Sequence, residues 1–265
     1  MPLTIDLTGK HALVTGVTSG IGAGIARVLA QAGANVFGCG RSELASKGAQ
    51  EFLSNGKDEG VSVAYRQVDV LSGLELQELP LVMAEEFGGI DILISNAGNN
   101  VFKGAAGCTE GEWQHNMDLN LASHWRLANY CRPYLEQNGG VIQIMTSNHA
   151  FASMPGCFPY NVTKTALTGL VRSLAIEWGP RIRTVGIAPG FIDSAGNDKW
   201  FETFPNAVEA RAKTIAMHPV GKLGTPEEIG GWCAFLASDY AAFASGATYI
   251  IDGGRLALLQ DSMGN

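Results

Sequence analysis

The chain has 265 residues, of which 46% are hydrophobic and 16% charged, and its formal net charge is −7. This length and apolar content predict a globular protein with a large buried core and argue against a disordered chain. The acidic balance, without a basic stripe, argues against nucleic acid or an anionic membrane as the main partner. No apolar run reaches about 18 residues, which argues against a membrane span.

The five cysteines are odd in number and widely scattered, with no Cys-x-x-Cys pair. This usage is typical of reduced thiols and argues against a disulfide framework or a zinc site. The first residues lack a basic segment followed by an apolar run, so no secretory signal is expected. Together these features predict a cytoplasmic protein.

A short apolar strand at residues 10–15 runs into a glycine-rich turn and then into a helical pattern at 21–32. Elements in this order predict a phosphate-binding unit, because glycines let the backbone approach a ligand and the helix N-terminus presents unpaired N–H groups to an anion. The alternative is a tight turn without a ligand. The cofactor contacts predicted here are Gly16, Thr18, Ser19, Gly20, Ile21 and Gly22.

The residues after the second predicted strand, 33–39, decide which dinucleotide fits. An acidic residue there would bind both ribose hydroxyls and repel a 2′-phosphate. This chain has Gly40, Arg41 and Ser42 instead. Arg41 can pair with a 2′-phosphate and Ser42 can hydrogen-bond to it, so the sequence favours NADP(H), with NAD(H) as the alternative. In that alternative Arg41 would stack on the adenine.

Strand and helix patterns alternate along the rest of the chain. Further helices are expected at 44–53, 74–87, 112–136, 160–178 and 226–236, and further strands at 61–68, 91–95, 141–146, 182–187 and 247–251. No linker or repeat divides the chain. We therefore predict an α/β fold: a Rossmann-like, doubly wound parallel sheet of about seven strands flanked by helices, in a single domain spanning 1–265.

Two further strand ends carry residues suited to a dinucleotide. Asp69 follows the third strand with Val70 and could hydrogen-bond the adenine amine. The fourth strand is followed by Asn96, Ala97 and Gly98, whose small side chains would let the chain pass close under a bound cofactor.

A tyrosine and a lysine stand four residues apart at the start of the helix predicted at 160–178. Four residues make about one helical turn, so Tyr160 and Lys164 should project from the same face. An ammonium group one turn away favours the phenolate and brings the phenol pKa from about 10 towards the working range. Such a tyrosine can move a proton on or off an alcohol oxygen.

These motifs together resemble the short-chain dehydrogenase/reductase family from Lys10 to Gly254. The matching residues, in the family's order, are Thr15, Gly16, Gly20, Gly22, Asn96, Ala97, Gly98, Asn120, Ser147, Tyr160, Lys164, Pro189 and Gly190. Ser147 lies 13 residues before Tyr160, which is the family's usual separation.

The resemblance implies a role for each catalytic residue. Tyr160 would be the general acid/base, and Ser147 would hold and polarise the substrate oxygen. Lys164 would lower the Tyr160 pKa and bind the nicotinamide ribose, and Tyr160 would contact the cofactor as well. Asn120 would interrupt its helix and hold a water linking Lys164 to solvent.

The resemblance also implies an NAD(P)-dependent oxidoreductase acting on a secondary alcohol or ketone, without a metal or a covalent intermediate. Ser194 takes the place of a threonine that contacts the cofactor in many relatives. A homotetramer or homodimer is implied. The further cofactor contacts expected after the sixth strand are Pro189, Gly190, Ile192 and Ser194.

The substrate is expected to lie between the catalytic residues and a lid at about 191–218, a stretch of irregular pattern. Polar side chains beside Ser147 favour a sugar- or polyol-like substrate, unless they only satisfy loop backbone. Aromatic residues of the lid fit an apolar or acyl ketone equally well, or are simply lid packing. The candidate substrate contacts are Asn99, Asn100, Asn148, His149, Phe151, Met154, Cys157, Trp200, Phe201 and Phe204.

Three rival functions remain open at this point. The first is an NAD-dependent catabolic dehydrogenase of a sugar or cyclic alcohol. The second is a non-catalytic dinucleotide-binding protein, against which the intact Asn120, Ser147, Tyr160 and Lys164 count. The third is a nucleotide-sugar epimerase or dehydratase, whose relatives usually have a longer segment after the last strand.

Overall fold

A computed structural model describes residues 4–258, so the outermost ends of the predicted domain, 1–3 and 259–265, lie outside the described residues. Seven parallel strands form one sheet in the order β3-β2-β1-β4-β5-β6-β7. The strands are β1 (His11–Thr15), β2 (Asn35–Gly40), β3 (Val63–Gln67), β4 (Ile92–Ser95), β5 (Val141–Met145), β6 (Arg183–Pro189) and β7 (Thr248–Ile251). The predicted doubly wound parallel sheet is confirmed.

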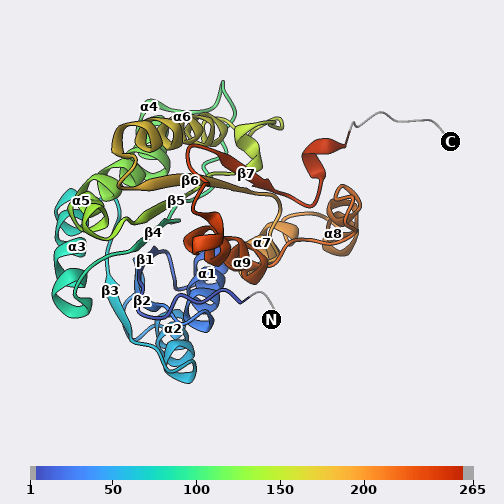
Figure 1. Cartoon of the computed structure of the whole chain (residues 1–265). Helices are drawn as coiled ribbons and strands as arrows, with labels where there is room; N and C mark the ends of the chain where they lie inside the picture. Colours follow the sequence, from blue (N-terminus) through green and yellow to red (C-terminus); the bar gives the residue numbers. More distant parts are fainter. Residues whose placement is uncertain (1–3, 259–265) are drawn as a thin grey trace.

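Helices cover both faces of this sheet (Figure 1). They are α1 (Gly20–Gln31), α2 (Lys47–Asp58), α3 (Gly73–Phe87), α4 (Glu110–Met117), α5 (Ser123–Asn138), α6 (Tyr160–Trp178), α7 (Ala195–Phe201), α8 (Ala207–Ala216) and α9 (Pro226–Ala237). Successive strand residues point to opposite faces, so the buried strands read as continuous apolar runs and feed two cores.

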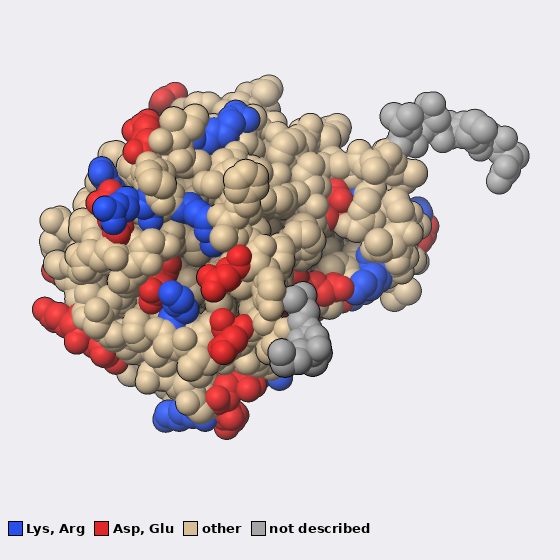
Figure 2. Space-filling view, in the orientation of Figure 1, with Lys and Arg blue, Asp and Glu red and all other residues tan. Residues whose placement is uncertain are grey.

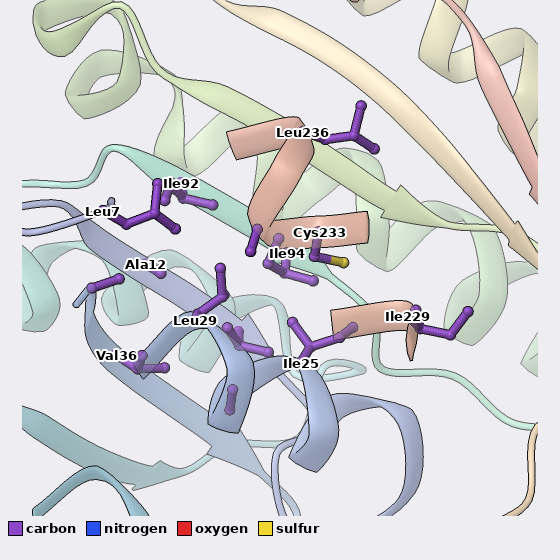
Figure 3. Packing of buried hydrophobic residues seen from close by; sticks show 14 of the residues in the cluster. Leu7, Ala12, Ile25, Leu29, Val36, Ile92, Ile94, Ile229, Cys233 and Leu236 are labelled. Carbon is purple, nitrogen blue, oxygen red and sulfur yellow. The ribbon is translucent and has the colours of Figure 1, made fainter. Parts of the chain in front are cut away.

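One core lies between the sheet and helices α1, α2 and α9. Figure 3 shows Ile25 and Leu29 of α1 packing with Ile229 and Cys233 of α9 over the strand residue Ile94. The other core packs α3, α5 and α6 against the opposite face, where Leu13 of β1 is fully buried. Strands buried on both faces fix the sheet rigidly, so its carboxyl edge is a stable platform for a site.

The strand order reverses between β1 and β4. From β1 the chain winds outward through β2 to β3, then crosses back to β4 and winds the other way. The loops after β1 and β4 therefore leave the sheet towards opposite faces, which opens a crevice at their carboxyl ends. Ligands bind at such a crevice in open α/β sheets.

Two stretches differ from the periodicity of the sequence. The helix predicted at 112–136 is interrupted around Asn120, as the family resemblance implied: α4 ends at Met117, a π-helical turn spans Asp118–Ala122, and α5 follows. The segment 191–218, expected to be irregular, contains α7 and α8. Asn206 caps α8 by accepting a hydrogen bond from the backbone N–H of Glu209. Helices this short show too little apolar periodicity to be recognised from sequence.

Charged side chains of both signs are mixed over the face seen in Figure 2. Within residues 4–258, no helix combines the length and the apolar character that crossing a membrane requires. All five cysteines are free thiols, four of them buried.

Helices α1 and α9 approach closely at glycines. A Cβ added to Gly24 of α1 would lie 2.3 Å from Cβ of Pro226, the first residue of α9, and 2.5 Å from its carbonyl carbon. Real Cβ atoms do not come this close, so one of the two helices would have to move. An added Cβ at Gly231, also on α9, would meet no atom within 4 Å.

We expect Gly24→Ala to lower the free energy of unfolding by about 1–3 kcal/mol through overpacking. Gly231→Ala is the matched control, and it should raise stability by about 0.5–1 kcal/mol because alanine is the better helix former. Urea unfolding of both variants measures the difference. Equal stabilisation by the two substitutions would contradict the close packing of α1 on α9.

Candidate active site

A cleft of about 980 Å³ lies at the carboxyl edge of the sheet. It brings together side chains from most of the strand ends between β1 and β6. The predicted site residues that line it are Gly16, Thr18, Ser19, Ile21, Gly22, Arg41, Ser42, Val70, Asn96, Ala97, Gly98, Asn99, Asn100, Asn148, His149, Met154, Ser147, Tyr160, Lys164, Pro189, Gly190, Ile192, Ser194 and Trp200.

The glycine-rich turn forms a cradle for an anionic group. Gly16 has a φ of +78°, and a Cβ on Gly22 would lie 2.2 Å from the Gly16 carbonyl oxygen, so neither position tolerates a side chain. Ser19 begins α1 in an extended conformation, and its side chain does not cap the helix. The first N–H groups of α1 are therefore left for a ligand, which fits the pyrophosphate of a dinucleotide.

The turn after β2 is held by residues of β3. The single proton of the Tyr65 hydroxyl is shared between the carbonyl oxygens of Ser42, at 2.6 Å, and Gly40, at 3.1 Å. The Gln67 amide donates to the carbonyl oxygen of Arg41 at 3.1 Å. The backbone of this turn is thus fixed, while the exposed Arg41 side chain forms no ion pair with any residue between 4 and 258.

Thr15 ties the loops after β1 and β4 together. Its hydroxyl accepts hydrogen bonds from the backbone N–H groups of Asn96 at 2.9 Å and Ala97 at 2.8 Å. The Asn96 side chain returns a hydrogen bond to the Thr15 carbonyl oxygen at 2.8 Å. Beyond these residues, a Cβ on Gly98 would lie 2.7 Å from Oδ1 of Asn120, so the chain passes tightly over the π-helical turn.

Asn120 holds the backbone of Asn99 at both of its polar groups. Its Nδ2 donates to the Asn99 carbonyl oxygen at 2.9 Å, and its Oδ1 accepts from the Asn99 N–H at 3.0 Å. The same Nδ2 donates to Oδ1 of Asn116 at 2.9 Å, and Asn116 donates to the carbonyl oxygen of Pro159 at 3.0 Å. This buried network links the loop after β4 to the start of α6.

Tyr160 is the first residue of α6 and faces Ser147, which follows β5. Burial raises the pKa of the Tyr160 phenol above its usual value, and a hydrogen bond with Ser147 opposes that rise. The rings of Phe102 and His149 flank the phenol edge-on, with centroids 5.4 and 6.2 Å from the Tyr160 centroid.

Lys164 lies one turn further along α6. Its Nζ is 5.5 Å from the centroid of the Tyr160 ring and donates a hydrogen bond to the carbonyl oxygen of Met145 at 3.0 Å. Burial lowers the pKa of Lys164 to about 7. Burial is the largest cause of both pKa shifts and disfavours the charged form of each group, and the expectation that Lys164 lowers the Tyr160 pKa stays a prediction.

Comparison with known proteins decides the family. A family model described as Enoyl-(Acyl carrier protein) reductase matches residues 16–255. The chain is 36% identical over 252 residues to human Dehydrogenase/reductase SDR family member 4, covering 94% of this chain and 88% of that protein. It is 35% identical over 256 residues to the Vibrio cholerae 3-oxoacyl-[acyl-carrier-protein] reductase FabG, covering 94% and 98%.

A solved structure agrees. A putative short-chain alcohol dehydrogenase from Sinorhizobium meliloti superimposes with a TM-score of 0.89 at 30% identity, covering 97% of this chain and all of that one. The chain belongs to the short-chain dehydrogenase/reductase family. It is therefore an oxidoreductase that acts on CH–OH or C=O groups, in a family that uses a nicotinamide cofactor, NAD(P)(H), and small-molecule substrates.

Some of the predicted contacts do not reach the cleft of this short-chain dehydrogenase/reductase. Gly20 lies outside its lining, and the Asp69 carboxylate accepts a hydrogen bond from the N–H of Leu71 at 3.0 Å. Phe151 is half exposed and Cys157 fully buried, and neither lines the cleft. Of the aromatic lid residues, Trp200 lines it, whereas Phe201 and Phe204 pack against Trp200.

Other residues line the cleft without having been named individually from the sequence. Phe102 and Arg255 lie outside the predicted lid, whereas Phe191, Thr214 and Met217 lie within it. Phe102 is placed by an antiparallel bridge to Pro159, a contact that no local pattern reveals. Arg255 had a usable signal, since a cation directly follows the Asp-Gly-Gly turn after the last strand.

The burial of Lys164 predicts a pH-dependent stability. Its pKa is about 7 in the folded protein against 10.5 ordinarily, so the unfolded chain binds more protons between these values. The free energy of unfolding should therefore rise with pH from about 7 upward, by up to about 1.4 kcal/mol per pH unit. Lys164→Met cannot titrate and should lack this rise.

Urea unfolding of wild type and Lys164→Met at several pH values from about 7 to 9 tests this. Lys57→Met, a substitution of an exposed lysine, is the control and should keep the wild-type slope. Parallel pH profiles for wild type and Lys164→Met would contradict the lowered pKa.

Proposed function

We propose that this enzyme interconverts a secondary alcohol and a ketone with NADP(H) as the preferred cofactor. The observation that carries the proposal is the common placement of Ser147, Tyr160 and Lys164 on the wall of one cleft that also contains the glycine-rich turn. A proton-transfer group, a hydrogen-bond donor and a dinucleotide cradle are then within one cavity. A non-catalytic binding protein would not need the first two.

Each side chain has a definite task in this proposal. When bound, the nicotinamide supplies or accepts the hydride. Tyr160 gives its phenolic proton to the substrate oxygen during reduction and takes it back during oxidation. Ser147 donates a hydrogen bond to the same oxygen and holds it next to Tyr160.

Lys164 stabilises the transient phenolate. A buried ammonium group beside Tyr160 interacts strongly with a negative charge on that ring, so ionisation of either group favours the charged form of the other. Asn120 supports this arrangement by fixing Asn99 and, through Asn116, the residue before Tyr160. The π-helical turn at Asp118–Ala122 points the Asn120 side chain into this network.

The preference for NADP(H) rests on the turn after β2. Its backbone is fixed by Tyr65 and Gln67, and Arg41 and Ser42 line the cleft. Thr18 of the glycine-rich turn lies beside Ser42, with their hydroxyl oxygens 3.4 Å apart. A guanidinium group and two hydroxyls at this place suit a 2′-phosphate.

The substrate is proposed to be polar, of sugar or polyol type. Asn148 and His149 line the cleft next to Ser147, and His149 Nδ1 is buried without a hydrogen-bond partner among residues 4–258. The segment 191–218 is proposed as the lid, with Trp200 as the aromatic residue that faces the substrate.

Assembly into a homotetramer or homodimer is part of the proposal. The family resemblance implies that subunits assemble through the helices that carry Asn120 and Tyr160. Trp125 on α5 is 49% exposed and Ile176 on α6 is 81% exposed, so both helices present large apolar side chains at the surface.

We expect Tyr160→Phe to lower kcat by about 100- to 10,000-fold, because the proton donor is lost. NADPH binding should change little, because the phenol hydroxyl is only one of many contacts expected to hold the dinucleotide. Steady-state oxidation of NADPH with a panel of ketones measures kcat, and tryptophan fluorescence measures binding. Tyr240→Phe, at an exposed tyrosine, is the control. Unchanged kcat in Tyr160→Phe would remove Tyr160 from the chemistry.

We expect Arg41→Ala to reduce the ratio of NADPH to NADH affinity by about tenfold, near 1.4 kcal/mol. The measurement is fluorescence transfer from the tryptophans to each reduced cofactor at matched ionic strength. Arg66→Ala is the control, because Arg66 on β3 pairs with Glu78 at 3.1 Å and does not line the cleft. An unaltered ratio in Arg41→Ala would mean that Arg41 does not bind a phosphate.

A further inference from the structure

The cleft carries an unusual set of charges for an acidic protein. The chain has 25 acidic and 18 basic residues. Among the described residues, however, the charged side chains that line the cleft are Arg41, Lys164 and Arg255, and none is an aspartate or glutamate. Arg41 and Lys164 have tasks in the proposed function. Arg255 has none so far.

The position of Arg255 is fixed by the turn that follows β7. After β7 the chain makes a tight turn in which Gly253 and Gly254 both have positive φ, +63° and +83°. The Asp252 carboxylate fixes this turn by accepting hydrogen bonds from the N–H groups of Gly254 at 3.0 Å and Leu256 at 2.9 Å. In Figure 1 the segment after β7 lies near α8.

The turn also packs against the residues that follow α8. A Cβ on Gly253 would lie 2.7 Å from Cγ2 of Val220, and the N–H of Val220 donates to the Gly253 carbonyl oxygen at 3.3 Å. Arg255 Nη2 lies 3.9 Å from Sδ of Met217, another residue of the cleft. The turn before Arg255 and the Arg255 side chain therefore both contact residues at the end of the proposed lid segment.

Arg255 lies near the reacting groups, with one histidine between. Its charge is close enough to contribute to the lowered pKa of His149, although burial of that imidazole is the larger cause. The His149 ring is in turn 6.2 Å from the Tyr160 ring. Both effects favour the neutral form of His149, so Arg255 is the positively charged side chain at this end of the cleft.

No carboxylate within residues 4–258 forms an ion pair with the half-buried Arg255 guanidinium. Burial lowers the Arg255 pKa and the negative charge of the nearby Asp252 partly opposes this effect, but both Asp252 oxygens accept hydrogen bonds from the backbone of the turn and neither pairs with the guanidinium group. Taking a guanidinium group partly out of water costs free energy unless an anion or several acceptors replace the water. A planar fork of donors at the wall of a substrate cleft suits a carboxylate or phosphate.

We propose that the substrate of this enzyme carries an anionic group, a carboxylate or a phosphate, that pairs with Arg255 while its carbonyl or alcohol oxygen meets Ser147 and Tyr160. This inference rests on the proposed function and narrows its polar substrate to an anionic one. His149 lies between the two ends of such a molecule and can hydrogen-bond to its middle. The charge fixes which end of the substrate faces Tyr160.

The test compares matched anionic and neutral substrates. Oxo acids of increasing chain length are compared with their methyl esters, and phosphorylated ketoses with the parent sugars, in NADPH oxidation. We expect wild type to prefer an acid or a phosphate to its neutral partner by at least about tenfold in kcat/KM. The acid series and the phosphate series separate the two sources of charge.

Arg255→Met should remove the preference, with a loss of about 10- to 100-fold in kcat/KM for the anion, mostly as higher KM, and little change for the neutral partner. Arg255→Lys should keep part of the preference. Arg66→Met, a substitution outside the cleft, should behave as wild type. An unchanged anion-to-neutral ratio in Arg255→Met would overturn the inference, as would an equal loss of NADPH affinity, which would assign Arg255 to the cofactor.

Failure of the proposed function would give a different experimental result from failure of the anion site. If wild type oxidises no NADPH with any carbonyl compound, the proposed reaction is wrong. In that case, Arg255 is still tested by a binding measurement. Tryptophan fluorescence reports how tightly the same oxo acids and sugar phosphates bind to the protein in the presence of NADP⁺. Binding that is weakened about 10- to 100-fold in Arg255→Met supports the anion site, and absent or unaltered binding overturns it.

Discussion

The site depends on the divergence of β1 and β4 at the carboxyl edge of a sheet that is buried on both faces. The two loops must leave this edge in opposite directions and still remain close enough to form one cavity. The reversal of strand order meets the first requirement, and Thr15 meets the second, because its hydroxyl accepts from two successive N–H groups of the loop after β4 and its carbonyl oxygen accepts from Asn96. The glycine-rich turn and the chain under the proposed nicotinamide site are thus held by one residue.

A second buried network fixes the catalytic end relative to the first. The π-helical turn between α4 and α5 inserts one extra residue per turn, which turns Asn120 towards Asn99. Asn116, one turn earlier, reaches the carbonyl oxygen just before Tyr160. Every polar group in this chain of contacts is satisfied by another, so the network is rigid as well as buried. The network therefore positions Tyr160 through hydrogen bonds between neutral groups. At this buried position, additional charged groups would cost free energy.

Sequence patterns predicted the sheet because apolar runs encode it locally. Fixed motif spacings indicated Ser147, Tyr160 and Lys164 as candidate catalytic residues, and all three line one cleft in the structure. Helix boundaries shifted by a few residues, and the break at Asp118–Ala122 followed from the family resemblance, not from periodicity. Contacts between distant segments could not be predicted: Phe102 enters the cleft through its bridge to Pro159, and Cys157 turns into the core instead of the cleft. The pKa directions of Tyr160 and Lys164 also required the structure, because burial outweighs their proximity.

Among the described residues, the cleft is lined by three cationic side chains and by no aspartate or glutamate. Because the chain carries a net charge of −7, the proposed anionic cofactor and anionic substrate both need local cations. Arg41, Lys164 and Arg255 supply them in one cleft, where Lys164 is buried, Arg255 half-buried and Arg41 exposed, so electrostatic interactions are strongest at Lys164. Such a cleft focuses the field lines inward and favours molecules with negative charge at defined places. Under this proposal, selectivity comes from the spacing of the three cations along the cleft, which is set by the ends of β2 and β7 and by α6.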